Sequence, residues 1–416
     1  MTFKELKLHP SLLKAIDEAK YVSPTPIQQQ AIPLILNGND VLGCAQTGTG
    51  KTASYVLPIL QQLFVNKATT KAPQCLIMAP TRELVLQISE TITSYTKYLP
   101  IKHVNLFGGQ SVHNQRSKMQ TMPQIIVATP GRLLDFLQSK FLDARQIKHF
   151  VLDEADQMLD MGFVKDIKKV IQFLPKEKQT LLLSATMPKE IEEFAQTILR
   201  KPQKVTVEKV SSTVKTVEQL MIYTDKQSKT SLLEKIIKEK NDDRCIVFVR
   251  TKYGADKLVK QLAKLDVHAQ AIHGNKSQNS RINTLESFKK RQLKVLIATD
   301  IAARGIDIEQ LPLVINYELP QVPETYVHRI GRTGRAGHTG LAISFCSEEE
   351  TKELNQIQKL IGITIPSDRF YTQPLEAKIV VEHKPKEQTK TQAKRKPYPK
   401  KEMRNNSPKK EVRNRK

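Results

Sequence analysis

The feature of this 416-residue chain that most constrains its fold is an alternation of short apolar stretches with segments of helical periodicity. In the first half, the apolar stretches predict strands at 40–44, 74–79, 103–107, 124–128, 149–153 and 179–183. In the second half, they predict strands at 218–223, 244–249, 268–272, 294–298, 312–316 and 340–345. Continuous apolar strands that alternate with helices indicate parallel sheets covered on both faces. The sequence therefore predicts an α/β fold with two tandem parallel-sheet domains.

The limits of these parts follow from local composition. The stretch 201–216 is polar and has no helical periodicity, which suits a linker or an edge segment. After about residue 379 the chain loses apolar periodicity and becomes rich in Lys, Pro and Asn, which is typical of disorder. We expect a first domain over 1–205, a second domain over 216–370, and a disordered basic C-terminal tail over 371–416.

The charge of the chain is uneven. The formal net charge is +24, and from His383 to Lys416 there are 14 Lys or Arg against 3 Glu, a net charge of +11 in 34 residues. A basic surplus of this kind favours a polyanionic partner, of which nucleic acid is the commonest.

Features of a membrane or secreted protein are missing from the sequence. The longest apolar runs, such as 124–128, are far shorter than the ~20 residues of a membrane helix, and the N-terminus has no apolar signal region. The cysteines lie far apart, with no CxxC pair and no His at a metal-like spacing, at Cys44, Cys75, Cys245 and Cys346. We therefore expect a cytoplasmic protein with reduced thiols, no membrane segment and no zinc site.

A glycine-containing turn follows the first predicted strand. The residues from Ala45 to Thr52 fit the phosphate-loop pattern, with Ala in place of the first Gly, between a strand and a helix. Gly48 and Gly50 let backbone N–H groups face a phosphate, and the helix N-terminus adds its positive dipole. Lys51 can reach the β- and γ-phosphates, and the Thr52 hydroxyl can bind Mg²⁺. The predicted ATP contacts of this turn are Ala45, Gln46, Thr47, Gly48, Thr49, Gly50, Lys51 and Thr52.

Three carboxylates lie close together at the end of another predicted strand, at Asp153, Glu154 and Asp156. A carboxylate opposite a phosphate loop holds Mg²⁺, usually through water, so Asp153 is predicted to bind the metal together with Thr52. Glu154 is predicted to orient and deprotonate the attacking water. Asp156 is expected to bind other protein groups instead of the metal. ATP and Mg²⁺ are the expected cofactors, and Lys51 and Glu154 the expected catalytic residues of this domain.

The phosphate loop by itself is shared by GTPases, kinases, transporters, motor proteins and helicases, although NKAT at 66–69 lacks the Asp of an NKxD guanine-binding motif. Residues 153–156 spell DEAD, and from Phe3 to about residue 370 the chain resembles the DEAD-box RNA helicases. The resemblance implies two RecA-like domains and an RNA-dependent ATPase.

The segment from Tyr21 to Gln28 resembles the Q motif of that family. By this resemblance the Gln28 amide, which can both donate and accept a hydrogen bond, binds the edge of adenine, and Phe3 stacks on the base. Lys20 stands where the family usually has Gly.

Three further stretches of the first domain resemble the RNA-binding motifs of the family, each after a predicted strand. Hydroxyl, guanidinium and loop N–H groups suit phosphate and sugar oxygens. The implied RNA contacts are Pro80, Thr81, Arg82, Gly108, Gly109, Thr129, Gly131 and Arg132. Ser184 and Thr186 resemble the motif that couples hydrolysis to strand separation, and their hydroxyls are able to bond to the DEAD carboxylates.

The second domain contains no GKT sequence, but 329–335 holds three arginines spaced by glycines. The resemblance implies that Arg332 and Arg335 reach the γ-phosphate as catalytic arginine fingers. It also implies that His328 and Arg329 bridge to the DEAD segment. The implied ribose contacts are Gly305 and Asp307. The implied RNA contacts of this domain are Arg250, Gln278, Arg281, Thr299 and Asp300.

The leading hypothesis is an ATP-dependent RNA helicase whose two domains close on ATP and RNA together and grip the sugar-phosphate backbone with little sequence preference. The alternatives are an ATP-driven RNA clamp that does not unwind, a DNA translocase or helicase, and, last, a phosphate-loop ATPase that binds no nucleic acid. The sequence DMGF at 160–163, the short leader before the first domain and the basic tail resemble the bacterial RhlE-like group. That resemblance implies ribosomal precursors or the RNA-decay machinery as partners.

Overall fold

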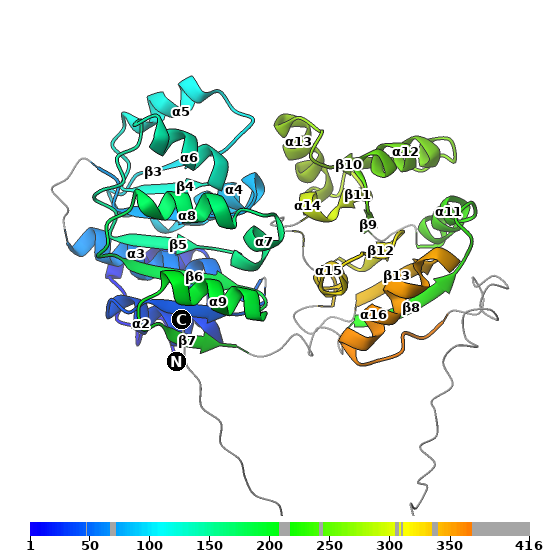
Figure 1. Cartoon of the computed structure of the whole chain (residues 1–416), viewed down its shortest axis with the longest axis horizontal. Helices are drawn as coiled ribbons and strands as arrows, with labels where there is room; N and C mark the ends of the chain where they lie inside the picture. Colours follow the sequence, from blue (N-terminus) through cyan, green and yellow to red (C-terminus); the bar gives the residue numbers. More distant parts are fainter. Residues whose placement is uncertain are drawn as a thin grey trace, which may run out of the picture.

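The computed structural model describes residues 1–46, 48–66, 72–207, 217–240, 244–303, 308, 311–334 and 340–367. Two α/β domains lie side by side, each with a parallel sheet covered by helices (Figure 1). Across these ranges, every helix is too short or too polar to span a bilayer.

The first sheet contains seven strands of the described chain, in the order β3-β4-β2-β5-β6-β1-β7, and every neighbouring pair is parallel. The strands are β1 (Val41–Cys44), β2 (Cys75–Met78), β3 (His103–Leu106), β4 (Ile125–Ala128), β5 (His149–Leu152), β6 (Gln179–Ser184) and β7 (Gln203–Thr206). β7 lies at the edge of the sheet, so the polar stretch 201–216 begins as an edge strand, and its remaining residues from 208 on lie outside the described residues.

Helices cover both faces of the first sheet. Successive side chains of a strand point to opposite faces, so Cys75 and Ile77 of β2 join one core while Leu76 and Met78 join the other. The face of Cys75 is covered by α1 (Pro10–Glu18), α2 (Pro26–Leu36), α3 (Lys51–Val65) and α4 (Arg82–Tyr95). The opposite face is covered by α6 (Pro130–Gln138), α7 (Ala155–Asp160), α8 (Val164–Gln172) and α9 (Lys189–Ile198), and α5 (Val112–Met119) lies beside β3.

The second sheet contains six described strands in the order β10-β11-β9-β12-β13-β8, again all parallel. The strands are β8 (Val217–Tyr223), β9 (Cys245–Val249), β10 (Ala269–Ile272), β11 (Val295–Thr299), β12 (Leu313–Asn316) and β13 (Gly340–Cys346). One face is covered by α11 (Lys229–Glu239) and α12 (Lys252–Ala263). The other is covered by α13 (Gln278–Lys289), α14 (Asp300–Ala303), α15 (Pro323–Ile330) and α16 (Thr351–Ile361), the last preceded by the short helix η1 (Glu348–Glu350).

The two sheets have the same strand order when both are taken from the same edge. β10, β11, β9, β12, β13 and β8 occupy the places of β3, β4, β2, β5, β6 and β1. The turn between β8 and α11 is therefore the counterpart of the phosphate loop between β1 and α3. Each of these two helices begins with a lysine followed by a threonine, Lys51-Thr52 in α3 and Lys229-Thr230 in α11.

The predicted fold class is confirmed. Every strand predicted from the apolar runs is present, and each end lies within one residue of its predicted position. Cys75, Cys245 and Cys346 are buried, Cys44 is half-buried, and none of the four forms a disulfide in the described part of the chain. The predicted tail at 371–416 lies outside the described residues.

The turn before the Q motif explains the departure at Lys20. Lys20 has a φ of 59°, which lies in the left-handed region that costs an L-residue about 1–2 kcal/mol. Its N–H donates to the Asp17 carbonyl at 3.0 Å, and the Tyr21 N–H donates to the Ile16 carbonyl at 3.2 Å. These two bonds form a Schellman end to α1, for which glycine is the usual residue at this position. Lysine therefore keeps the turn that glycine favours, with local backbone strain.

Candidate active site

The phosphate loop lies at the carboxyl end of β1, where ligands of open α/β sheets bind. Gly48 and Gly50 have φ values of 80° and 87°, which allow the backbone to turn into α3. The Lys51 side chain is buried, and its Nζ donates to the Ala45 carbonyl. Within the described part of this loop, the Thr49 hydroxyl also donates to the Gln46 carbonyl at 2.6 Å. The loop thus closes on itself through its own hydrogen bonds.

Gln28 connects the Q motif to this loop. Its Oε1 accepts from the Thr25 N–H at 3.0 Å, and its Nε2 donates to the Gly50 carbonyl at 3.2 Å. A Cβ on Gly50 would meet this amide, so glycine is required there for the close approach as well as for its φ. An amide has two donor hydrogens and two acceptor lone pairs, so one of each remains for a base. Phe3 lies in the first-domain core, where it is 7% exposed.

Asp153 is held at the end of β5 by two hydrogen bonds. Its Oδ1 accepts from the Glu154 N–H at 2.9 Å, and its Oδ2 accepts from the Tyr55 hydroxyl at 2.9 Å. Burial raises the pKa of the Asp153 carboxyl, although the Lys51 charge and the Tyr55 hydroxyl act in the opposite direction. The Asp153 carboxylate and the Thr52 hydroxyl, both in contact with the Tyr55 hydroxyl, are oxygen ligands of the kind that Mg²⁺ prefers, so the residues present fit the predicted metal.

Glu154 has a buried carboxyl and an unusual backbone conformation. It has a φ of 53° and is 3% exposed, and its Oε2 has no hydrogen-bond partner among the described residues. Burial, followed by the charge of Asp153, raises its pKa to about 7, while the charges of Lys51 and Arg332 lower it. A carboxyl that titrates near neutral pH with a free oxygen is suited to accept a proton from water. Arg332 comes from the second domain, so both domains act on this carboxyl.

Asp156 binds protein groups that lead to β6. Its Oδ2 accepts from the N–H groups of Ala185 and Thr186 at 3.1 and 2.9 Å, and from the Thr186 hydroxyl at 2.9 Å. The Ser184 hydroxyl donates instead to the Thr186 carbonyl at 2.6 Å. The segment from Ser184 to Thr186 is therefore hydrogen-bonded to α7, the helix that follows Asp153 and Glu154.

The first-domain RNA candidates surround Arg82. The backbones of Gly108 and Gly109 pack against its guanidinium, and a Cβ on Gly109, which has a φ of 82°, would collide with it. Thr81 caps α4 by accepting from the Leu84 N–H at 3.2 Å. The structure thus brings two of the predicted motifs together. The third begins α6, with Thr129 at its N-cap and the Arg132 guanidinium donating to the Gln110 carbonyl at 3.3 Å.

Polar residues of the two domains meet at Glu83. Its carboxylate accepts from the Gln278 amide at 3.0 Å and pairs with the Arg281 guanidinium at 2.9 Å. Arg82 in turn donates to Gln278 at 3.3 Å. Burial and the nearby charge of Arg281 lower the pKa of Arg82. The guanidinium groups of Arg82 and Arg281, from opposite domains, therefore lie near each other at this contact. Glu83 is the carboxylate that binds there.

The Arg329 guanidinium contacts residues of its own domain. Its guanidinium donates to the Asp300 carboxylate, with the Nη2 bond at 2.8 Å, and to the Asn316 amide oxygen at 3.1 Å. It also lies over the Phe248 ring, 5.0 Å from the centroid. Asp300, a predicted RNA contact, is thus the counter-ion of Arg329 in this structure.

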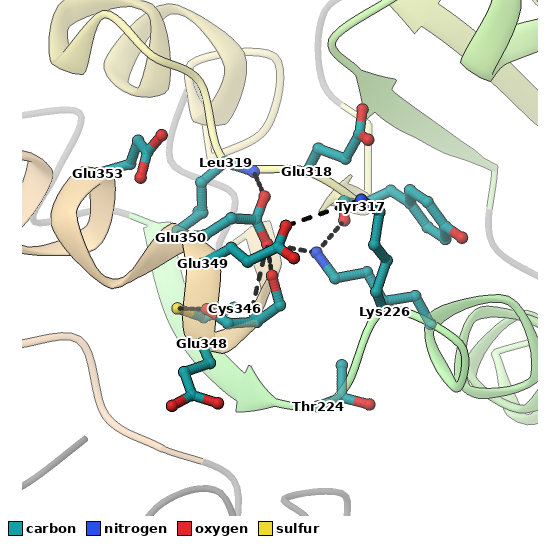
Figure 2. Close-up of polar contacts among 12 residues, drawn as sticks. Thr224, Lys226, Tyr317, Glu318, Leu319, Cys346, Glu348, Glu349, Glu350 and Glu353 are labelled. Atoms are coloured by element: carbon teal, nitrogen blue, oxygen red, sulfur yellow. Dashed lines mark hydrogen bonds and ion pairs between the residues drawn. The ribbon is translucent and has the colours of Figure 1, made fainter. Parts of the chain in front are cut away.

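Arg250 likewise points into the second domain. Its guanidinium donates to the Leu319 carbonyl and pairs with the carboxylates of Glu350 and Glu353 at 3.2 and 3.4 Å. Glu350 also accepts from the Leu319 N–H at 3.0 Å (Figure 2). It pairs as well with the buried Lys229 amine at 2.5 Å. This network lies at the carboxyl ends of β9, β12 and β13, beside a cavity of about 590 Å³.

The remaining predicted site residues are of two kinds: those that the structure describes and those that lie outside the described residues. His328 and Arg332 line a small cavity at the end of α15 with Asp300 and Arg329. Pro80 and Gly131 lie in the turns before α4 and at the start of α6, and Thr299 is the last residue of β11. The residues that lie outside the described residues are Thr47, Gly305, Asp307 and Arg335.

Two residues of the site were not selected by the sequence reasoning. Glu83 lies inside a predicted RNA motif, but its partners come from the other domain and no local pattern points to them. Tyr55 follows Lys51 by four residues on α3, a spacing that places both side chains on the same face of a helix. That spacing was the available signal, and an aromatic residue in an apolar helix is usually part of the core.

The comparisons with known proteins agree with this geometry. The family model "DEAD/DEAH box helicase" matches residues 25–194, and the model "Helicase conserved C-terminal domain" matches residues 228–337. The chain is 39% identical to the ATP-dependent RNA helicase DbpA of Bacillus subtilis over 363 residues, which are 87% of this chain and 75% of that protein. It is 43% identical to the DEAD-box ATP-dependent RNA helicase RhpA of Helicobacter pylori over 364 residues, 88% of this chain and 73% of that protein.

A solved structure shows the same arrangement of both domains. S. cerevisiae Dbp5 bound to RNA and ADP BeF3 superposes with a TM-score of 0.80 at 34% identity, covering 88% of this chain and 95% of that one. Three findings identify the family. They are the two RecA-like domains, the phosphate loop beside the DEAD carboxylates, and the relatives that match along most of their length. The chain belongs to the DEAD-box ATP-dependent RNA helicases and is an enzyme with RNA-dependent ATPase activity.

Proposed function

We propose that this helicase couples Mg²⁺-dependent ATP hydrolysis to the local opening of RNA duplexes or RNA–protein complexes, in ribosome assembly or RNA turnover in the cytoplasm. The observation that carries this proposal is the contact between the domains at Glu83, which binds Gln278 and Arg281 of the second domain. The charge of Arg332, also from the second domain, lowers the pKa of Glu154 in the first.

Mg²⁺ is assigned to Thr52 and Asp153. When bound, the metal supplies positive charge to the phosphate oxygens of ATP. Lys51 contributes its ammonium to the same phosphates after leaving the Ala45 carbonyl. Glu154, with a free oxygen and a pKa of about 7, accepts the proton of the attacking water.

Closure of the two domains is proposed to complete the site. Arg332 adds a positive charge from the second domain where charge develops on the γ-phosphate, an effect worth up to ~10³–10⁵ in rate in other phosphate-loop enzymes. The fold similarity to a relative bound to RNA and ADP BeF3 includes both domains, which supports the view that the observed arrangement is close to the form that binds both ligands.

RNA is proposed to cross from one domain to the other beside Arg82 and Arg281. Burial and the nearby charge of Arg281 lower the pKa of Arg82, and a phosphate placed beside the two guanidinium groups would offset this repulsion, since phosphate binds Arg through paired hydrogen bonds. Contacts of this kind hold the backbone of RNA and do not select its sequence. Asp300 and Arg250 would have to exchange their present ion pairs to bind RNA directly.

The cellular role rests on sequence features. The basic stretch from His383 to Lys416 supports attraction to structured RNA of any sequence, as in ribosomal precursors or decay intermediates. The RhlE-like subgroup remains a prediction, since relatives named DbpA, RhpA and CshA match at similar identity.

The test is ATP turnover by the purified chain with no nucleic acid, with RNA, and with DNA of matching sequence. Stimulation by RNA alone, abolished in Glu154→Gln and strongly reduced in Arg281→Ala, is the expected result. Arg145→Ala is the matched control, because that arginine pairs only with the exposed Asp143 in the described structure and should behave as the unmodified protein. Turnover that RNA does not change would contradict the coupling of closure to hydrolysis.

Release of a labelled strand from an RNA duplex distinguishes unwinding from clamping. ATP-dependent release is expected. RNA-stimulated turnover with stable RNA binding and no release would favour the clamp.

A further inference from the structure

The buried hydroxyl of Tyr55 lies between two residues assigned to the metal. Tyr55 lies in the second turn of α3, its side chain is fully buried, and its hydroxyl donates to Oδ2 of Asp153 at 2.9 Å. The Thr52 side chain is also within hydrogen-bonding reach of this hydroxyl. Thr52 and Asp153 are far apart in the sequence, and the phenol is a group that contacts both.

The position does not need a hydroxyl for packing. Most of the buried neighbours of Tyr55 on α3 are apolar, including Val56, Leu57 and Ile59, and a phenylalanine would fill nearly the same volume. A buried hydroxyl costs free energy unless it is hydrogen-bonded, so its presence requires a partner. The hydroxyl donates to the Asp153 carboxylate.

The carboxylate is in turn fixed at both oxygens. Oδ1 accepts from the Glu154 N–H and Oδ2 from Tyr55, each at 2.9 Å. The first bond comes from the adjacent peptide and cannot by itself set the rotation of the carboxylate plane. The second comes from a different element and restrains that rotation. Without Tyr55, one oxygen of a side chain that is 2% exposed loses its hydrogen-bond donor.

We propose that Tyr55 is a positioning residue for Mg²⁺, whose hydroxyl holds the Asp153 carboxylate in the orientation that receives the metal. This inference rests on the proposed assignment of the metal to Thr52 and Asp153. Groups that orient a metal-binding carboxylate typically change metal affinity by ~10- to 100-fold when removed. Tyr55 therefore acts through Asp153.

The experiment is Tyr55→Phe in the full chain, with a fluorescent ADP analogue titrated at Mg²⁺ concentrations from micromolar to millimolar. The expected result is a rise of about tenfold or more in the Mg²⁺ concentration that gives half-maximal nucleotide binding. Nucleotide binding in the presence of EDTA should be the same in both proteins, because the variant changes the metal site and leaves the loop intact.

Tyr95→Phe is the matched control. Tyr95 is also a buried tyrosine of the first domain, and its hydroxyl hydrogen bonds to Tyr21. This variant should lose similar stability in thermal unfolding without any change in the Mg²⁺ dependence. Equal Mg²⁺ dependence in Tyr55→Phe and Tyr95→Phe would overturn the inference.

Asp153→Asn separates failure of the inference from failure of the metal assignment. If it raises the half-saturating Mg²⁺ concentration while Tyr55→Phe does not, Asp153 binds the metal but Tyr55 does not position it. If Asp153→Asn leaves the Mg²⁺ dependence unchanged, the metal assignment itself is wrong, and the role of Tyr55 fails with it.

Discussion

Replacement of Glu154 by glutamine should stabilise the nucleotide-free protein. The carboxyl is 3% exposed, and burial and the charge of Asp153 raise its pKa from 4.5 to about 7. A tenfold change in acid strength is worth about 1.4 kcal/mol, so this shift corresponds to about 3 kcal/mol of unfavourable free energy for the ionised form in the folded state.

The sign of the effect depends on pH. A carboxyl with a raised pKa binds its proton more tightly in the folded state, so its contribution to stability is fully present below about pH 4.5 and is lost as the pH rises through about 7. Glutamine resembles the protonated acid at every pH. The variant should therefore match the unmodified protein near pH 4.5 and exceed it by about 3 kcal/mol above pH 8.

The assay is urea unfolding of both proteins in EDTA without nucleotide, from pH 5 to pH 8.5. Asp156→Asn is the comparison within the same motif, since Asp156 accepts three hydrogen bonds from Ala185 and Thr186 and its replacement should destabilise the first domain. The reasoning would be refuted by a Glu154→Gln protein that gains nothing at pH 8.5, or whose gain is the same at pH 5.

Three other changes have clear expected outcomes. Lys20→Gly should raise stability by about 0.5–1 kcal/mol in thermal unfolding, because relief of the left-handed φ exceeds the added chain entropy of glycine. Lys229→Met should lower the free energy of unfolding in urea by about 3 kcal/mol or more, since it leaves the buried Glu350 without that partner. Lys226→Met is the control: it breaks an exposed ion pair with Glu349 and should cost under about 1 kcal/mol. Removal of 383–416 should weaken RNA binding and flatten its salt dependence in fluorescence anisotropy, because a net charge of +11 is lost. An unchanged value in any of these assays would contradict the corresponding argument.

The sequence predicted the fold well because the strands are buried on both faces. Such strands appear as continuous apolar runs, for example CLIM at 75–78 and CIVFV at 245–249, which need no knowledge of their neighbours to be identified. The polar edge strand β7 gave no such signal, and only its suitability as an edge segment was anticipated.

The site was predictable only where its chemistry is local. The phosphate loop and the DEAD carboxylates are short motifs, each complete within a few residues. The contact of Glu83 with Gln278 and Arg281 depends on how two domains dock, which no single segment encodes. The inward direction of Arg250 depends on Glu350, a residue 100 positions further along the chain.

The shared strand order of the two sheets has a consequence for stoichiometry. The turn after β8 leads into a helix that begins with a lysine and a threonine, as the phosphate loop does, but the Lys229 amine already pairs with the carboxylate of Glu350. The two domains thus have corresponding turns, each followed by a lysine. In the second domain a carboxylate of the protein pairs with the lysine, so that turn is not expected to bind a phosphate. Calorimetric titration should therefore saturate at one nucleotide per chain, and binding of a second nucleotide would contradict this reasoning.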